Sequence, residues 1–122
     1  MQAFELFRND DNTQTFAAGT QIFAEGEPGR NMYVVKEGKV DIVSRGQVLE
    51  TVGPGGIFGE MALIDKAHRS AGAVAKTDCT VVLIDERRFL YLVQESPYFA
   101  LSVMGVMADR LRRVTPLQAA AS

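Results

Sequence analysis

Cysteine and histidine are nearly absent from this sequence, which holds one of each, Cys79 and His68, in 122 residues. A single cysteine excludes a disulfide within the chain. One cysteine and one histidine also fall short of the three or four ligands that a protein zinc site uses, so we expect no metal site. Long apolar runs are lacking as well, and no segment reaches the roughly 20 apolar residues of a membrane-spanning helix.

A basic excess and a secretion signal are lacking too. The net charge is −2 and the sequence pI is about 5.4, whereas a nucleic-acid-binding domain usually has a high pI. The first residues do not form a charged region followed by an apolar stretch, so no signal peptide is predicted. With no secretion signal and one cysteine, we expect a cytoplasmic protein.

The length suffices for one domain, which we place at 1–122, and is too small for two. The first part, about 13–85, consists of short apolar runs separated by turns that contain glycine. Residues 32–35 and 40–43 are two such runs, with Gly38 in the turn between them. Short strands with turns every eight to twelve residues or so predict an all-β barrel or sandwich.

From Asp85 onward the spacing of apolar residues becomes helical. Asp85 suits the N-cap of a helix over about 86–95. A second helix is predicted over about 97–114, with Pro97 at its favoured first position. We expect Pro116 to end this helix, because proline lacks the N–H group that a helix interior uses.

The second predicted helix carries two apolar rows. One comprises Met104, Met107, Leu111 and Val114, and the other comprises Phe99, Val103 and Val106. Two rows make the helix apolar over more of its circumference than a simple surface helix. The helix could therefore cover the β-rich part as a lid or pair with a second copy of the chain, so the sequence leaves monomer and homodimer open.

Residues 58–71 bring together an acid, an arginine and the start of a short helix. Glu60 follows Gly59 where a strand runs into the helix, and Arg69 comes nine residues later. Free N–H groups at a helix start carry partial positive charge, and an arginine can grip two phosphate oxygens. Gly59 lets the backbone approach a ligand, and Glu60 can accept a hydrogen bond from a sugar hydroxyl. The segment suits a ligand with a phosphate and a sugar, although an ordinary Glu60–Arg69 ion pair remains the alternative.

The segment 58–63, together with Arg69-Ser70-Ala71, resembles the phosphate-binding cassette of the cyclic nucleotide-binding domain family. That family includes the catabolite activator protein, the regulatory subunits of cyclic-AMP-dependent kinase, cyclic-GMP-dependent kinase and cyclic-nucleotide-gated channels. The resemblance extends over about 16–114. Glycines stand at the family's turn positions: Gly26, Gly38, Gly46, Gly53, Gly55 and Gly59. The resemblance implies a mainly β fold, an antiparallel β-roll of the double-stranded β-helix or jelly-roll type, followed by two C-terminal α-helices.

The resemblance also assigns ligand-binding roles within the cassette. The cyclic phosphate would meet the backbone N–H groups of Met61 and Ala62 and the side chain of Arg69. Ser70 would add its backbone N–H and its hydroxyl, and Glu60 would accept a hydrogen bond from the ribose 2′-OH.

The nucleotide base would lie against residues outside the cassette. By position in the resemblance, these are Ile42 and Leu49 in the roll and Arg110, Arg113 and Val114 in the second helix. Ile42 and Leu49 could equally be plain core residues, and the two arginines could equally form the solvated basic end of a helix.

The residue after the arginine bears on which nucleotide binds. In kinases of the family, cyclic-GMP sites often have a hydroxyl residue there, as Ser70 is here, and cyclic-AMP sites usually have alanine. The bacterial activator nevertheless pairs Arg-Ser with cyclic AMP, and Arg69-Ser70-Ala71 resembles that branch. We therefore favour cyclic AMP over cyclic GMP.

These features indicate a binding protein and not an enzyme. A cupin-type metal enzyme would need a cluster of His and carboxylate ligands that His68 alone cannot supply, and hydrolysis would need metals or a placed base. Because the sequence ends at Ser122, soon after the second helix, we expect no DNA-binding segment. We expect a small sensor that acts through a protein effector, or a nucleotide buffer. The alternative is a degenerate β-roll that serves only protein contacts, although such a roll would be expected to lose the acid or the arginine.

Overall fold

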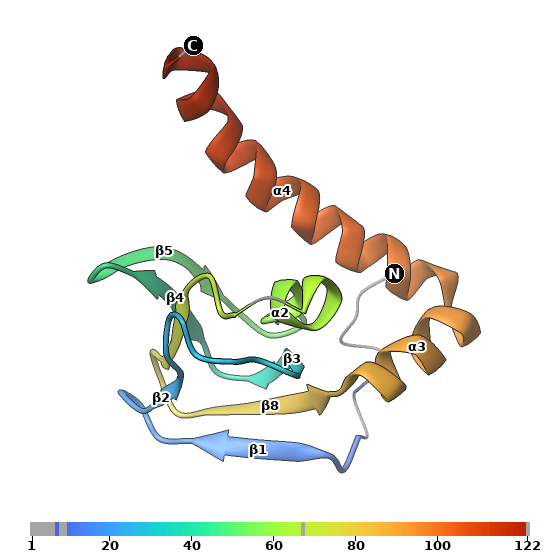
Figure 1. The fold of residues 1–122 in the computed structure, drawn as a ribbon. Helices are drawn as coiled ribbons and strands as arrows, with labels where there is room; N and C mark the ends of the chain where they lie inside the picture. The colour runs from blue at the N-terminus through green and yellow to red at the C-terminus, as the bar shows by residue number, and fades with distance from the viewer. Residues whose placement is uncertain (1–6, 8–9, 67, 122) are drawn as a thin grey trace.

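Two antiparallel four-stranded sheets form a roll in the computed structural model, which describes residues 7, 10–66 and 68–121 (Figure 1). The first sheet holds, in spatial order, β1 (Thr13–Phe16), β8 (Cys79–Ile84), β3 (Met32–Glu37) and β6 (Ile57–Phe58). The second holds β2 (Gln21–Phe23), β7 (Gly72–Ala75), β4 (Val40–Ser44) and β5 (Gln47–Val52). The predicted antiparallel β-roll followed by helices is confirmed.

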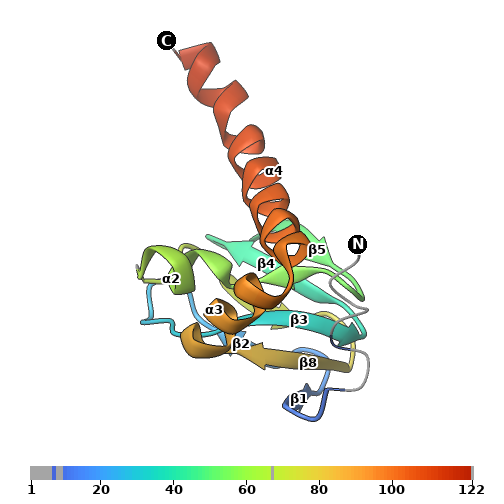
Figure 2. The ribbon, with the colours of Figure 1, turned by 90° about the vertical axis from the view of Figure 1, so that its right-hand side faces the viewer.

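Three helices of the described chain gather at one end of the roll (Figures 1 and 2). Helix α2 (Glu60–Asp65) lies between β6 and β7, whereas α3 (Glu86–Glu95) and α4 (Pro97–Ala121) follow β8. Asp85 caps α3, because its side chain accepts a hydrogen bond from the Arg88 backbone N–H at 2.8 Å. This bond satisfies one of the N–H groups that a helix start leaves without a partner.

The prediction that Pro116 ends the last helix is wrong, because α4 continues to Ala121 and projects beyond the roll (Figure 2). A proline deprives the helix of one N–H donor, but alanine, which fills 119–121, has the highest helix propensity. The predicted limit at 114 is therefore too short. Side chains of α4 are described as far as Arg113, so the side chain of Val114 lies outside the described residues.

Strand β3 divides its side chains between two hydrophobic cores. Met32 and Val34 join a core that the helices cover, whereas Tyr33 and Val35 join the core inside the roll. Successive side chains of a strand point to opposite faces. A strand that is covered on both faces therefore reads as the unbroken apolar run seen at 32–35.

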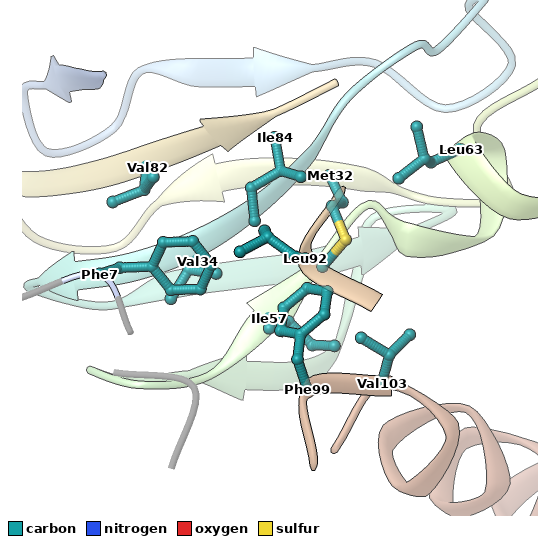
Figure 3. Packing of buried hydrophobic residues seen from close by; sticks show 10 residues of the cluster. All are labelled: Phe7, Met32, Val34, Ile57, Leu63, Val82, Ile84, Leu92, Phe99 and Val103. Carbon is teal, nitrogen blue, oxygen red and sulfur yellow. The ribbon is translucent and has the colours of Figure 1, made fainter. Parts of the chain in front are cut away.

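The core under the helices fixes the first turns of α4 to the roll. Its buried members are Phe7, Met32, Val34, Ile57, Leu63, Val82, Ile84, Leu92, Phe99 and Val103 (Figure 3). Phe99 and Val103 are 1% and 2% exposed, so one of the two predicted apolar rows packs on the roll. Met104, in the other row, is 56% exposed. Each fully buried side chain of this size contributes about 1.5–3 kcal/mol relative to an exposed one.

The core inside the roll includes a stack of three aromatic rings. Its members are Phe23, Tyr33, Val35, Val40, Val52, Phe58, Ala73, Ala75, Cys79 and Val81. Ring centroids of Phe23, Tyr33 and Phe58 lie 5.0 to 6.0 Å apart. Phe58 immediately precedes Gly59, so this rigid stack supports the start of the cassette.

The described residues offer neither a membrane-spanning helix nor a cluster of metal ligands. None of their helices combines the length and the apolar character needed to cross a membrane. Among the same residues, no three His, Cys, Asp or Glu side chains gather closely enough to hold a metal ion.

Candidate ligand-binding site

Gly59 begins the cassette in a conformation that other residues rarely adopt. Its φ is 79°, in the left-handed region, and it is the N-cap of α2 with no side-chain cap bond. A Cβ atom at this position would lie 2.8 Å from Nη1 of Arg69. Glycine is therefore required both by the backbone angle and by the close approach of the arginine.

Arg69 lies inside the protein, only 6% exposed, and its guanidinium is held by neutral groups. Nη1 donates to the Gly59 carbonyl oxygen at 2.9 Å, and Nη2 donates to the Asn31 carbonyl oxygen at 2.8 Å. The guanidinium carbon stands 4.0 Å from the centroid of the Phe23 ring, a cation–π distance. These contacts fix the orientation of the guanidinium. None of them comes from a carboxylate, so no hydrogen-bonded anion among the described residues neutralises its positive charge.

The third nitrogen of the same guanidinium has no partner. Nε of Arg69 is buried and makes no hydrogen bond within the described part of the chain. Burial lowers the pKa of the Arg69 guanidinium below its ordinary value, and Tyr33, Glu27 and Glu60 act against that shift. Arginine nevertheless keeps its proton in proteins, so the site presents a buried cation. A buried charge that no carboxylate contacts directly is costly, and an anion bound beside it would offset that cost.

Glu60, the first residue of α2, is 1% exposed and pairs with an arginine that the sequence did not assign to it. Its Oε1 lies 2.5 Å from Nη1 of Arg110 on α4. The predicted alternative, an ion pair between Glu60 and Arg69, is therefore wrong, because Glu60 pairs with Arg110. Since a carboxylate has two oxygens with several lone pairs, Glu60 keeps the capacity to accept a further hydrogen bond.

Glu50 on β5 is the residue that sequence reasoning missed. It receives Nε and Nη2 of Arg110 at 3.0 and 3.2 Å and Nη1 of Arg113 at 2.9 Å. Burial alone would raise the pKa of the Glu50 carboxyl, but the two arginines outweigh burial and hold it below its ordinary value. No local signal marks Glu50, because its partners lie 60 residues or more away in the sequence.

A small cavity of about 70 Å³ unites most of the predicted site residues. Its lining comprises Phe23, Ile42, Phe58, Gly59, Glu60, Met61, Ala62, Arg69, Ser70, Ala71 and Arg110. All six predicted cassette residues are among these, and so are Ile42 and Arg110 of the five predicted base contacts.

The other predicted base contacts lie elsewhere or are not described. Leu49 is 56% exposed on β5 and is not part of the cavity lining. Arg113 pairs with Glu50 and is also absent from the lining. The side chain of Val114 lies outside the described residues. The structure thus brings Ile42 and Arg110 to the cassette and keeps Leu49 and Arg113 apart from it.

Comparison with known proteins agrees with this arrangement. The family model described as "Cyclic nucleotide-binding domain" matches residues 13–96. The Cyclic AMP receptor protein of Thermus thermophilus is 34% identical over 102 residues, which cover 80% of this chain and 47% of that protein. The crystal structure of Thermus thermophilus Catabolite Activator Protein superposes with a TM-score of 0.75 at 34% identity, over 84% of this chain and 51% of that one.

A further solved structure matches over almost the whole of both chains. It is described as "A cyclic-GMP-dependent signalling pathway regulates bacterial phytopathogenesis", and it has a TM-score of 0.72 at 30% identity over 95% of each chain.

The extent of these matches differs between relatives. The chain spans about half the length of the curated bacterial relatives that it matches. The matched segment 13–96 contains both sheets, the cassette and α3. The chain therefore belongs to the cyclic nucleotide-binding domain family.

Proposed function

We propose that this chain binds a cyclic nucleotide, with cyclic AMP favoured over cyclic GMP, and acts as a small sensor or regulatory module in signal transduction. The observation that carries the proposal is the environment of the Arg69 guanidinium. Its guanidinium is buried, is bound by two carbonyl oxygens and has an unpartnered Nε. A cyclic phosphate carries one negative charge, which one arginine balances.

The other groups of the cavity suit the remaining parts of such a ligand. Glu60 lies in the same lining as Arg69 and offers an acceptor for the ribose 2′-OH. Ser70 and the backbone N–H groups of Met61 and Ala62 would add donors to the phosphate. Ile42 offers an apolar surface for the base, and Arg110 belongs to the same lining.

The preference for cyclic AMP rests on the Arg69-Ser70 pair and on the name of a relative from Thermus thermophilus. The relative from Thermus thermophilus is named a cyclic AMP receptor protein. The solved structure that covers 95% of both chains is described by a cyclic-GMP-dependent pathway, so cyclic GMP is the competing ligand.

Calorimetric titration of the protein with each cyclic nucleotide tests the proposal, with linear 5′-AMP as the control for phosphate charge alone. We expect binding of both cyclic nucleotides, tighter binding of cyclic AMP, and weak binding of 5′-AMP. Tighter binding of cyclic GMP would reverse the preference but keep the function.

The competing function is a β-roll that serves only as a protein-interaction module. It is favoured by the small size of the cassette cavity, about 70 Å³, compared with the roughly 300–1,000 Å³ of common small-molecule sites. A ligand that binds the folded state raises the melting temperature. If neither nucleotide at millimolar concentration raises it, the interaction module is the better assignment.

The rest of the proposed role concerns signal output. We propose that binding occurs without catalysis, that the protein acts in the cytoplasm, and that a protein effector reads the position of the helices after Asp85. A pulldown with and without cyclic nucleotide would identify such an effector, and sedimentation would distinguish a monomer from a homodimer through α4.

A further inference from the structure

Among the described side chains of helix α4, Arg110 is the one that lines the cavity, and the other lining residues belong to the roll and the cassette. All three of its guanidinium nitrogens are engaged. Nη1 contacts Glu60, Nε and Nη2 contact Glu50, and Nη2 also donates to the Ile57 carbonyl oxygen at 2.9 Å. The group therefore joins α4, strand β5 and the cassette at a single point.

Arg110 also lines two hollows of different size. It belongs to the lining of the cassette cavity of about 70 Å³ and to that of a larger groove of about 720 Å³ between α4 and the 50–57 segment. A cavity of 70 Å³ is too small for a cyclic nucleotide, because small-molecule sites commonly measure roughly 300–1,000 Å³. A ligand of that size fits within this lining only if part of the wall moves outward.

Arg110 is the part of the wall that comes from helix α4, and carboxylates of the roll and the cassette hold its guanidinium in place. The remaining lining residues belong to strands and to the cassette itself, and Phe23 and Phe58 are locked in the aromatic stack. Arg110, in contrast, reaches the cavity as a long side chain whose position depends on two carboxylates. Glu50 supplies two of its hydrogen bonds and also holds Arg113.

We infer that Glu50 is a positioning residue that holds Arg110 as a gate between the cassette cavity and the groove beside α4. This inference rests on the proposed function, because the gate controls the entry of the nucleotide. Glu50 itself is absent from the cavity lining. Weakening its hydrogen bonds with Arg110 therefore loosens Arg110 and leaves Arg69 and Glu60 in the site.

Stopped-flow kinetics with a fluorescent cyclic nucleotide tests the gate in Glu50→Gln. Hydrogen bonds to charged groups are strong enough for their loss to change a rate about tenfold. We expect the association and dissociation rates to rise together by about tenfold, so that Kd changes much less than either rate. Asp109→Asn is the matched control, because it also removes one negative charge next to the arginines but affects Arg112, outside the cassette cavity. We expect wild-type rates for this control.

Two kinetic results would overturn the gate. A rise in the dissociation rate alone would show that Glu50 supports ligand binding, and unchanged rates in Glu50→Gln would show that it does not restrain Arg110. A melting temperature measured for each variant separates these results from unfolding.

A second measurement requires no nucleotide. Amide exchange over 103–113 should be faster in Glu50→Gln than in the wild type and in Asp109→Asn, because α4 loses an anchor. Unchanged exchange would contradict the anchoring role even if no nucleotide binds. Absence of binding to every variant, with faster exchange in Glu50→Gln, would instead sink the proposed function and the gate's role in entry, while keeping Glu50 as the anchor of α4.

Discussion

The cassette and helix α4 each place an arginine in the wall of one cavity, and the two arginines have opposite surroundings. Arg69 donates to two carbonyl oxygens and faces an aromatic ring, whereas Arg110 bridges two carboxylates. An arginine between carboxylates has its charge balanced within the protein. An arginine among neutral groups retains its charge for an anion from outside. The partners of each arginine therefore support the proposal that Arg69 meets the phosphate, whereas the charge of Arg110 is already balanced by Glu50 and Glu60.

Replacement of Arg69 should produce the largest effect. In Arg69→Ala the cyclic phosphate would be buried without a counter-charge, and we expect a loss of about 4 kcal/mol of binding free energy, measured by calorimetry. We expect little change in the free energy of unfolding, because burying the Arg69 charge is costly in the free protein and no carboxylate of the described residues is hydrogen-bonded to it there. Arg87→Ala, an exposed arginine on α3, is the control and should bind normally. Affinity like that of the wild type in Arg69→Ala would remove the basis of the comparison.

Replacement of Arg110 should mainly affect stability. Arg110→Met leaves Glu60 as a buried carboxylate without its partner, and we expect a loss of about 3 kcal/mol in the free energy of unfolding, measured with urea. Adding Glu60→Gln to this variant should recover much of the loss, because no charge is then left unpaired. If the double variant is as unstable as the sum of the single variants, the two residues are not coupled.

Neighbouring residues of α4 provide a smaller effect that separates packing from charge. Val103→Ala removes buried atoms from the core under the helices, and we expect a loss of about 2 kcal/mol in the free energy of unfolding. Met104→Ala, one position along, should change it by less than about 0.5 kcal/mol, because Met104 is exposed. Equal losses would mean that both faces of α4 are covered in solution.

The pH dependence of stability should show the smallest effect. The pKa of Glu50 in the folded protein lies below its ordinary value of 4.5. A lowered pKa means that the folded state binds this proton less readily than the unfolded state. The contribution of Glu50 is therefore present above pH 4.5 and is lost as the pH falls through the lower, folded-state pKa. The stability difference between the wild type and Glu50→Gln should shrink over that range in denaturation at several pH values, and a difference that grows would contradict the arginine bridge.

The elements of the fold could be predicted from local patterns, and the charge network could not. Glycine turns and apolar runs indicated the strands, and Asp85 and Pro97 indicated the starts of the two last helices. The cassette residues were recognisable because they lie within one segment. Glu50 and Arg110 are 60 residues apart, and only the docking of α4 on β5 brings them together. For the same reason the sequence suggested Arg69 as the partner of Glu60, since nearness in sequence was the available guide.

The pairing of the first strand with the last one bears on how the chain acquires its fold. Thr13 of β1 lies opposite Val82 of β8, and β8 is also the partner of β3, so β8 occupies an interior place in its sheet. During synthesis that sheet lacks this strand until the segment 79–84 has left the ribosome. Until then β1 has no partner strand, and closure of the roll requires contacts that span nearly 70 residues. Non-local pairing of this kind slows folding to the millisecond-to-second range typical of β-rich domains. The cassette, encoded before β8, therefore attains its final surroundings only after the chain that follows it has been made.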